Sequence, residues 1–321
     1  MSSSRIPVHL ITGFLGSGKT TFLNHFIRNF PGERVVVIEN EVGKVNINGG
    51  LLSKETFQVE ELTAGCLCCS LNTELIEVLE RIHTQKDKID RLIIETTGIA
   101  DPEPVLLPFF SHPAVEAAFE LIHTICLVDA ENIEDWIIET EEAKKQIAVA
   151  DVILINKSDL VQQDYLNLLT LEIRSINPMA RVWTGSQGRF EVDPILEVIP
   201  HREETAARYF PKVEAASAAN KHGMSTFTLI FDRPFQLQSL SNELWKLLVI
   251  NAHQIYRVKG IIYANSYPVP VILQSVKNQL VMTDGEPDAD GIPGQSKIVF
   301  IGKNLKKEAI QRIFSRHLIQ G

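Results

Sequence analysis

The chain has 321 residues, of which 45% are hydrophobic, and a formal net charge of −9 at neutral pH. This composition predicts a large and a small globular domain, and the acidic balance excludes nucleic acid as the main partner because that role needs a basic face. No stretch approaches the roughly 18 to 20 apolar residues of a membrane span. A start that runs directly into a strand pattern, without a charged leader, leads us to expect a cytoplasmic protein with no membrane partner.

The first predicted elements flank a glycine-rich loop. Val8–Ile11 has the apolar pattern of a strand and Thr21–Ile27 that of a helix. Between them, Gly13–Thr20 fits the phosphate-binding pattern G-x-x-x-x-G-K-[ST] in the strand–loop–helix setting that it requires. The predicted nucleotide contacts in this region are Gly13, Phe14, Leu15, Gly16, Ser17, Gly18, Lys19, Thr20 and Thr21.

The residue types of this loop suit phosphate chemistry. Its glycines, at 13, 16 and 18, let backbone N–H groups turn inward with no side chain in the way. Lys19 offers a mobile ammonium to the β and γ phosphate oxygens, and Thr20 offers a hydroxyl to Mg²⁺. A phosphate-binding loop is therefore the first functional prediction.

Three of the four cysteines follow within one short segment, at Cys66, Cys68 and Cys69. Disulfides are rare in a reducing compartment, and thiolates this closely spaced suit Zn²⁺ or another thiophilic ion. Three ligands leave one coordination position open to water or to a ligand from a receiving protein. A redox-active thiol pair and a purely structural turn remain alternatives. The fourth cysteine, Cys126, lies in an apolar strand pattern and is interpreted as inert core.

Two motifs farther along define the nucleotide enzyme. The strand pattern Leu92–Ile94 leads to Glu95, whose carboxylate can join the Mg²⁺ shell, and to Gly98, whose N–H can reach the γ-phosphate. The predicted catalytic residues are Lys19, Glu39 and Glu95, with Glu39 and Glu41 as candidates to orient the attacking water.

The second motif, Asn156–Asp159, follows the strand pattern Val152–Ile155. The Asp159 carboxylate can accept hydrogen bonds from N1–H and N2–H₂ of guanine, whereas adenine presents an acceptor at N1 and is rejected. Lys157 is expected along the face of the base, and Asn156 is expected either to contact the guanine O6 or to brace the loop. The predicted nucleotide is GTP.

Alternating strand and helix patterns predict an α/β fold with a mainly parallel sheet. We place a P-loop GTPase domain with the cysteine site at residues 1–200, a linker at 201–222 and a smaller α+β domain at 223–321. The other strands predicted in the first domain are Arg34–Ile38, Phe57–Leu62, Ile122–Val128 and Arg181–Thr184, and the helices are Leu71–His83, Glu103–Ser111, Ile133–Val149 and Tyr165–Ile176. In the second domain, strands are predicted at Ser225–Phe231, Arg257–Ala264, Pro270–Gln274, Gln279–Thr283 and Lys297–Gly302, and helices at Leu237–Val249 and Lys306–Leu318.

Taken together, these motifs resemble the CobW family of metal-transfer P-loop GTPases, which includes zinc chaperones. The resemblance rests on Gly13–Thr21, Glu39–Glu41, Gly65–Cys69, Glu95–Gly98 and Asn156–Asp159, and it extends to Arg257–Gly260 and Lys297–Gly302. It implies a nucleotide site at Gly13–Thr20 and Asn156–Asp159, and a metal site at Cys66, Cys68 and Cys69. Lys44 and Asn48 depart from the family, which usually carries acids there, and His112 resembles a family position near the metal.

The sequence therefore predicts a GTPase that carries Zn²⁺ and releases it into a client metalloprotein when GTP is hydrolysed. Co²⁺, Ni²⁺ and Fe²⁺ are not excluded as the metal, and a homo-oligomer stays open. The alternatives are a nucleotide-gated metal sensor or scaffold without client transfer, a cobalt or iron insertion factor, and a small-molecule kinase. GTP, Mg²⁺ and Zn²⁺ are the predicted ligands.

Overall fold

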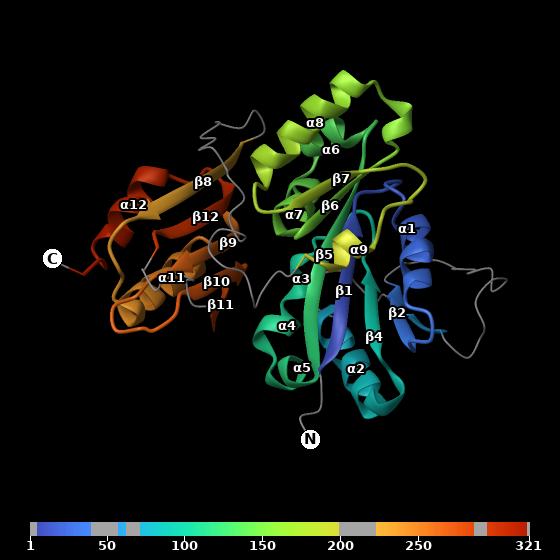
Figure 1. Ribbon diagram of the computed structural model, residues 1–321, viewed down its shortest axis with the longest axis horizontal. Coiled ribbons are helices and arrows are strands. Elements are labelled where there is room, and N and C mark those ends of the chain that lie inside the picture. The colour runs from blue at the N-terminus through green and yellow to red at the C-terminus, as the bar shows by residue number, and fades with distance from the viewer. Residues whose placement is uncertain (1–4, 40–56, 62–70, 199–222, 286–293, 320–321) are drawn as a thin grey trace. The chain divides into compact units, whose positions relative to one another are not determined.

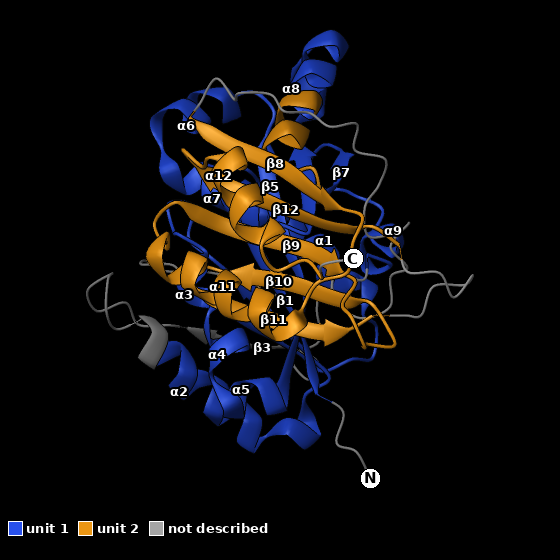
Figure 2. Ribbon diagram, turned by 90° about the vertical axis from the view of Figure 1, so that its left-hand side faces the viewer, with its two compact units in different colours: residues 1–170, 180–198 blue, residues 171–179, 199–321 orange. Residues whose placement is uncertain are grey.

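The computed structural model describes residues 5–39, 57–61, 71–198, 223–285 and 294–319 (Figure 1). They form two compact units: residues 1–170 with 180–198, and residues 171–179 with 199–321 (Figure 2). The predicted linker lies outside the described residues, so the domain boundaries stay a prediction. Within the described ranges, none of the helices combines the length and hydrophobicity that a membrane crossing requires.

The first unit is built on a seven-stranded sheet in the order β3-β2-β4-β1-β5-β6-β7. Every neighbouring pair is parallel, and the central strands are rich in Val, Ile and Leu because both faces of such a sheet are covered. The strands are β1 (Ile6–Gly13), β2 (Val35–Glu39), β3 (Phe57–Glu61), β4 (Arg91–Glu95), β5 (Phe119–Asp129), β6 (Val152–Asn156) and β7 (Arg181–Thr184). This confirms the predicted α/β fold with a mainly parallel sheet.

The connections between these strands are mostly helical. Residues of α1 and α9 pack with sheet residues in one hydrophobic cluster, and α7 packs on β1 and β5. The helices are α1 (Lys19–Phe26), α2 (Leu71–Thr84), α3 (Glu103–Leu106), α4 (Pro108–Ser111), α5 (Pro113–Ala118), α6 (Ile133–Glu139), α7 (Glu141–Val149), α8 (Gln163–Ile176) and α9 (Asp193–Leu196). Helices α5 and α9 were not predicted from the sequence.

Two predicted helices are each broken in the structure. The pattern at 133–149 forms α6 and α7, because Thr140 is extended (φ −129°) and its side chain accepts a hydrogen bond from the Ala143 N–H at 3.3 Å. Such a side chain satisfies an N–H that the start of a helix would leave unpaired. The pattern at 103–111 forms α3 and α4, since Pro108 begins α4 and has no N–H with which to continue α3.

A chain of hydrogen bonds crosses the core of the sheet. The Nη1 of Arg91 lies 2.5 Å from Nε2 of His9, the Nδ1 atoms of His9 and His123 lie 3.1 Å apart, and Nε2 of His123 contacts the Val198 carbonyl. Arg91 also pairs with Glu33 at 2.8 Å. Because a guanidinium only donates, His9 Nε2 must accept, and each histidine must then donate to the next acceptor in one direction.

The second unit is a five-stranded sheet in the order β11-β10-β9-β12-β8, with every neighbouring pair antiparallel. The strands are β8 (Met224–Phe231), β9 (Ile255–Ile262), β10 (Val271–Val276), β11 (Gln279–Asp284) and β12 (Ser296–Lys303), and the helices are α11 (Leu237–Ile250) and α12 (Lys307–Ser315). Leu240, Leu244 and Leu248 recur every four residues, so α11 buries one face in the hydrophobic core on the sheet.

Candidate nucleotide-binding site and cysteine segment

The glycine-rich loop joins β1 to α1 at the carboxyl end of the sheet, and its backbone conformation depends on glycine. Gly13, Gly16 and Gly18 have φ values of 140°, 72° and 93°, which side-chain-bearing residues rarely adopt. A Cβ at Gly13 would also collide with the Leu127 carbonyl, and one at Gly18 would collide with the Asn156 amide. The loop can therefore hold its backbone N–H groups close to an anion.

Polar groups inside the loop fit phosphate as a ligand. Nζ of Lys19 donates to the carbonyls of Gly13 at 2.9 Å and Phe14 at 3.2 Å. The Ser17 hydroxyl is buried and, among the described residues, has no hydrogen-bond partner. Leu15 is half exposed, Thr21 is exposed, and the Phe14 ring packs on Trp136 with centroids 4.6 Å apart.

Residues suited to Mg²⁺ meet beside the loop. The Thr20 hydroxyl donates to Oε1 of Glu95 at 3.0 Å, and Glu95 is the buried last residue of β4. A hydroxyl and a carboxylate oxygen form a donor set that Mg²⁺ accepts. Glu39 ends β2 with its backbone in register with Glu95, and its side chain lies outside what the structure describes. Gly98 follows β4 and approaches Leu15 so closely that a Cβ would come within 2.7 Å of the Leu15 nitrogen.

The guanine motif follows β6 and is tied to the glycine-rich loop. The buried Asn156 amide donates to the Ser17 carbonyl at 2.9 Å, and its oxygen accepts from the Gly188 N–H at 3.0 Å. Of the two roles predicted for Asn156, the structure therefore displays the brace. Lys157 is left-handed (φ 60°), and Asp159 is exposed in the short turn Ser158–Leu160.

Two features of this site were missed from the sequence. Asp129 ends β5, is buried and pairs with Nζ of Lys157 at 2.7 Å. The turn Gly185–Gly188 after β7 reaches the same place, where the Gly185 carbonyl accepts from the N–H of Ser158 at 3.1 Å. A carboxylate at the end of a buried strand, and a Gly-Ser-Gln-Gly segment directly after another, were the available signals.

The cysteine segment lies outside the described residues, and so do Glu41, Lys44 and Asn48. Within the described ranges, no three His, Cys, Asp or Glu side chains gather as metal ligands. Cys126 is buried in β5, where burial raises the pKa of its thiol to about 12, so it is poorly suited to bind metal, as expected. His112 lies between α4 and α5.

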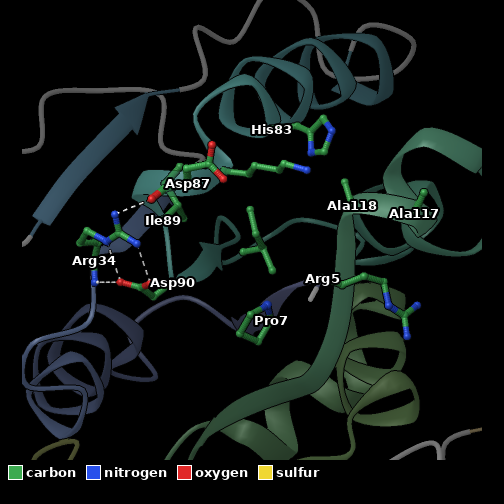
Figure 3. A pocket seen from close by; sticks show the side chains of 11 residues that line it. Arg5, Pro7, Arg34, His83, Asp87, Ile89, Asp90, Ala117 and Ala118 are labelled. Carbon is green, nitrogen blue, oxygen red and sulfur yellow. Dashed lines mark hydrogen bonds and ion pairs between the residues drawn. The ribbon is translucent and has the colours of Figure 1, made fainter. Parts of the chain in front are cut away.

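A separate pocket of about 620 Å³ opens at the amino ends of the strands (Figure 3). It is lined by residues that precede or begin β1, β2, β4 and β5, among them Arg5, Arg34, Asp90 and Ala118. Arg34 and Asp90 form a two-pronged pair at 2.8 Å, and these hydrogen bonds lower the pKa of Asp90 to about 2. The glycine-rich loop is at the opposite ends of the same strands, so this pocket is not part of the nucleotide site.

Comparison with known families identifies both units. The family model for the CobW/HypB/UreG nucleotide-binding domain matches residues 7–184, and the model for the cobalamin synthesis protein CobW C-terminal domain matches residues 224–318. The chain belongs to the CobW family. The resemblance inferred from the motifs is thereby confirmed.

Relatives in the CobW family match nearly the whole chain. The zinc chaperone YjiA of Escherichia coli is 31% identical, over 97% of this chain and 98% of its own length. The zinc chaperone CobW of Pseudomonas aeruginosa is 28% identical over 96% of this chain and 90% of its own. The crystal structure of the Zn(II)-bound YjiA GTPase from E. coli superposes with a TM-score of 0.74 at 26% identity, covering 98% of this chain and 100% of that one.

Proposed function

We propose that this chain is a GTP-dependent zinc chaperone, which hydrolyses GTP to GDP and phosphate and transfers zinc to a client metalloprotein. The observation that carries the proposal is the joint presence of the phosphate and guanine elements at one edge of the sheet, in a chain whose full-length relatives are named zinc chaperones. Cys66, Cys68 and Cys69 are proposed as the zinc ligands. We expect the protein to act in the cytoplasm.

In the proposed reaction the protein mainly positions groups and stabilises charge. The backbone N–H groups of Gly13–Thr20 hold the phosphates, and the Lys19 ammonium exchanges its carbonyl contacts for phosphoryl oxygens as negative charge builds up there. Thr20 and Glu95 would hold Mg²⁺, which neutralises charge on the β and γ phosphates when bound. Glu39 is proposed to orient the attacking water because its backbone is paired beside Glu95.

The base is proposed to bind across the ends of β6 and β7. The exposed Asp159 carboxylate would accept from guanine N1–H and N2–H₂, and Lys157 would lie along the face of the ring. Asn156 ties this loop to the phosphate loop through the Ser17 carbonyl. Base recognition and phosphate binding would therefore be mechanically linked.

The decisive experiment measures zinc affinity in two nucleotide states. Competition with a chromogenic chelator would be run with GDP and with a non-hydrolysable GTP analogue. A useful switch requires coupling of about 5- to 150-fold, and the same factor must appear in nucleotide affinity when zinc is varied. Equal zinc affinities in both states, with and without client, would leave a metal-binding GTPase with no transfer cycle, which is the sensor alternative.

Matched variants separate the two sites. Lys19→Ala should abolish GTP hydrolysis and keep the zinc stoichiometry, because the ammonium serves the phosphates and the thiolates serve the metal. Cys66→Ala should lose zinc, whereas Cys126→Ala, which removes a buried thiol with a raised pKa, should retain it. Loss of zinc from folded Lys19→Ala would mean that the two sites are one.

A further inference from the structure

Helix α7 holds the segment that follows Glu95 through a buried amide. Nε2 of Gln146 donates to the carbonyl of Gly98 at 3.2 Å and to the carbonyl of Ala100 at 3.0 Å. Gln146 is 1% exposed, so these bonds form away from water, where a buried polar group that loses its partner is penalised most. One side chain thus fixes two carbonyls of the same turn.

The preceding residue of α7 makes a second attachment. Nζ of Lys145 lies 2.5 Å from Oδ2 of Asp101 and 3.7 Å from Oε2 of Glu103. Oδ1 of Asp101 in turn accepts from the N–H of Glu103 at 3.0 Å, at the start of α3. Residues 98–103 are therefore attached to α7 at both ends.

The opposite side of this segment contacts the phosphate loop at Leu15. Gly98 can approach Leu15 this closely because glycine has no side chain. The absence of a side chain also gives the Gly98 backbone the widest conformational freedom. Because the Gly98 carbonyl is held by Gln146, rotation about its Cα–C bond is restricted from the other side. The contact with Leu15 and the bonds to Gln146 together define one backbone conformation.

The helix pair that carries these side chains also contacts the phosphate loop. Trp136 of α6 packs on Phe14, and Thr140 joins α6 to α7 by accepting from the Ala143 N–H and donating to the Trp136 carbonyl at 2.8 Å. The frame that holds residues 98–103 is therefore fixed to the loop that holds the phosphates.

We propose that Gln146 and Lys145 are positioning residues that keep Gly98 in the conformation that reads the terminal phosphate, so that α7 sets the preference for nucleoside triphosphate over diphosphate. This inference rests on the proposed function only in taking the glycine-rich loop as the nucleotide site. It assigns to α7 a role in the reaction in which neither Gln146 nor Lys145 touches the substrate, because both act through the segment that contains Gly98.

The test compares Gln146→Met with wild type by calorimetry of GDP and of a non-hydrolysable GTP analogue, together with kcat and KM for hydrolysis. Methionine keeps the length of the side chain and removes both donors. Because the N–H of Gly98 is proposed to donate to the γ-phosphate, which GDP lacks, we expect the affinity for the triphosphate to fall by about tenfold, the size of one weakened hydrogen bond to a charged group, and the affinity for GDP to stay within about twofold. Gln238→Met, which removes an exposed amide bonded to Asn242 on α11, should match wild type.

If Gln146→Met does not fold, variants of the partly exposed pair Lys145 and Asp101 provide a second test. Lys145→Met and Asp101→Asn should each lower the triphosphate-to-diphosphate preference, and the double variant should be no worse than Lys145→Met alone, because that variant already removes the pair with Asp101. Equal losses for both nucleotides would mean that α7 only supports the fold, and unchanged affinities would mean that it has no part in nucleotide binding. If wild type prefers another purine or shows no zinc coupling, the proposed function fails, and the ratio measured with the preferred nucleotide still decides this inference.

Discussion

Asp159 is the residue on which the choice of base depends. Its carboxylate is exposed at the end of the buried strand β6, on a loop braced by Asn156. We predict that Asp159→Asn weakens GTP binding by roughly 2 to 4 kcal/mol, because a charged double acceptor becomes an amide that presents a donor. Calorimetry with GTP and ATP would show the discrimination shrinking. Asp164→Asn, which changes an exposed carboxylate on the nearby α8, should bind as wild type, and unchanged affinity in Asp159→Asn would remove the assignment.

His9 and His123 give the core a dependence on pH. Burial, followed by the charges of His123 and Arg91, lowers the pKa of His9 well below its usual value, and burial lowers the pKa of His123. A protonated histidine donates from both ring nitrogens. In His9 one donor would then face the Arg91 guanidinium, which also only donates, and the two Nδ1 atoms would face each other as donors if both histidines were protonated. The folded protein thus binds fewer protons than the unfolded chain below about pH 6.5.

Because these pKa values are lowered in the folded state, the stability of the folded protein decreases as the pH falls. Stability from the neutral pair is present above about pH 6.5, where the unfolded histidines are neutral too, and is lost progressively as the pH falls below that value. Urea unfolding across this range should show a shallower decline in His9→Leu/His123→Leu, whatever its absolute stability. His83→Gln, at an exposed position, should keep the wild-type slope. A double variant with the full wild-type decline would contradict this account.

At the scale of elements, the sequence predicts most strands because each buried strand is a nearly unbroken apolar run. It fails where a polar side chain competes with a helix. Thr140 sits inside a helical pattern and its hydroxyl ends one helix and starts the next, and no apolar periodicity reports that exchange. Pro108 was a visible signal that one predicted helix divides.

The candidate site was predictable to the extent that its motifs are contiguous. Gly13–Thr20 and Asn156–Asp159 each carry their chemistry in one short segment. The attachment of Gly98 to Gln146 joins residues 48 positions apart, and the pair between Asp129 and Lys157 joins residues 28 positions apart. Only the register of the sheet and the packing of α7 bring such partners together, and a single sequence contains neither.

At the scale of the whole molecule, the important feature is that the two units share one continuous helix, α8. The helix starts shortly after the guanine motif, its first part belongs to the first unit, and residues 171–179 belong to the second (Figure 2). The carbonyl of Ile176, at its end, accepts from the buried hydroxyl of Thr226 on β8 at 2.8 Å. An α-helix melts cooperatively, so unfolding of either unit disturbs an element of the other.

We therefore predict that nucleotide stabilises both units together. At about 100 times its Kd, GDP adds about 2.7 kcal/mol to the folded state, and the melting temperature of a chain of this length that unfolds as one unit should rise by about 4 °C. In Trp136→Phe/Trp183→Phe, the remaining Trp245 on α11 reports the second unit by fluorescence, while far-UV circular dichroism reports the whole chain. Coincident rises are expected. A fluorescence midpoint that ignores GDP would mean that the units melt independently.

The shared helix also limits how this protein can be divided for study. A fragment that stops at residue 198 would retain residues 171–179 yet lose β8, leaving the Ile176 carbonyl without Thr226 and the buried side chain of Ile176 without the unit that it belongs to. Such a fragment should be poorly soluble on its own. A fragment intended for the study of nucleotide chemistry alone will need polar surface substitutions on the second half of α8. Otherwise the full chain has to be used.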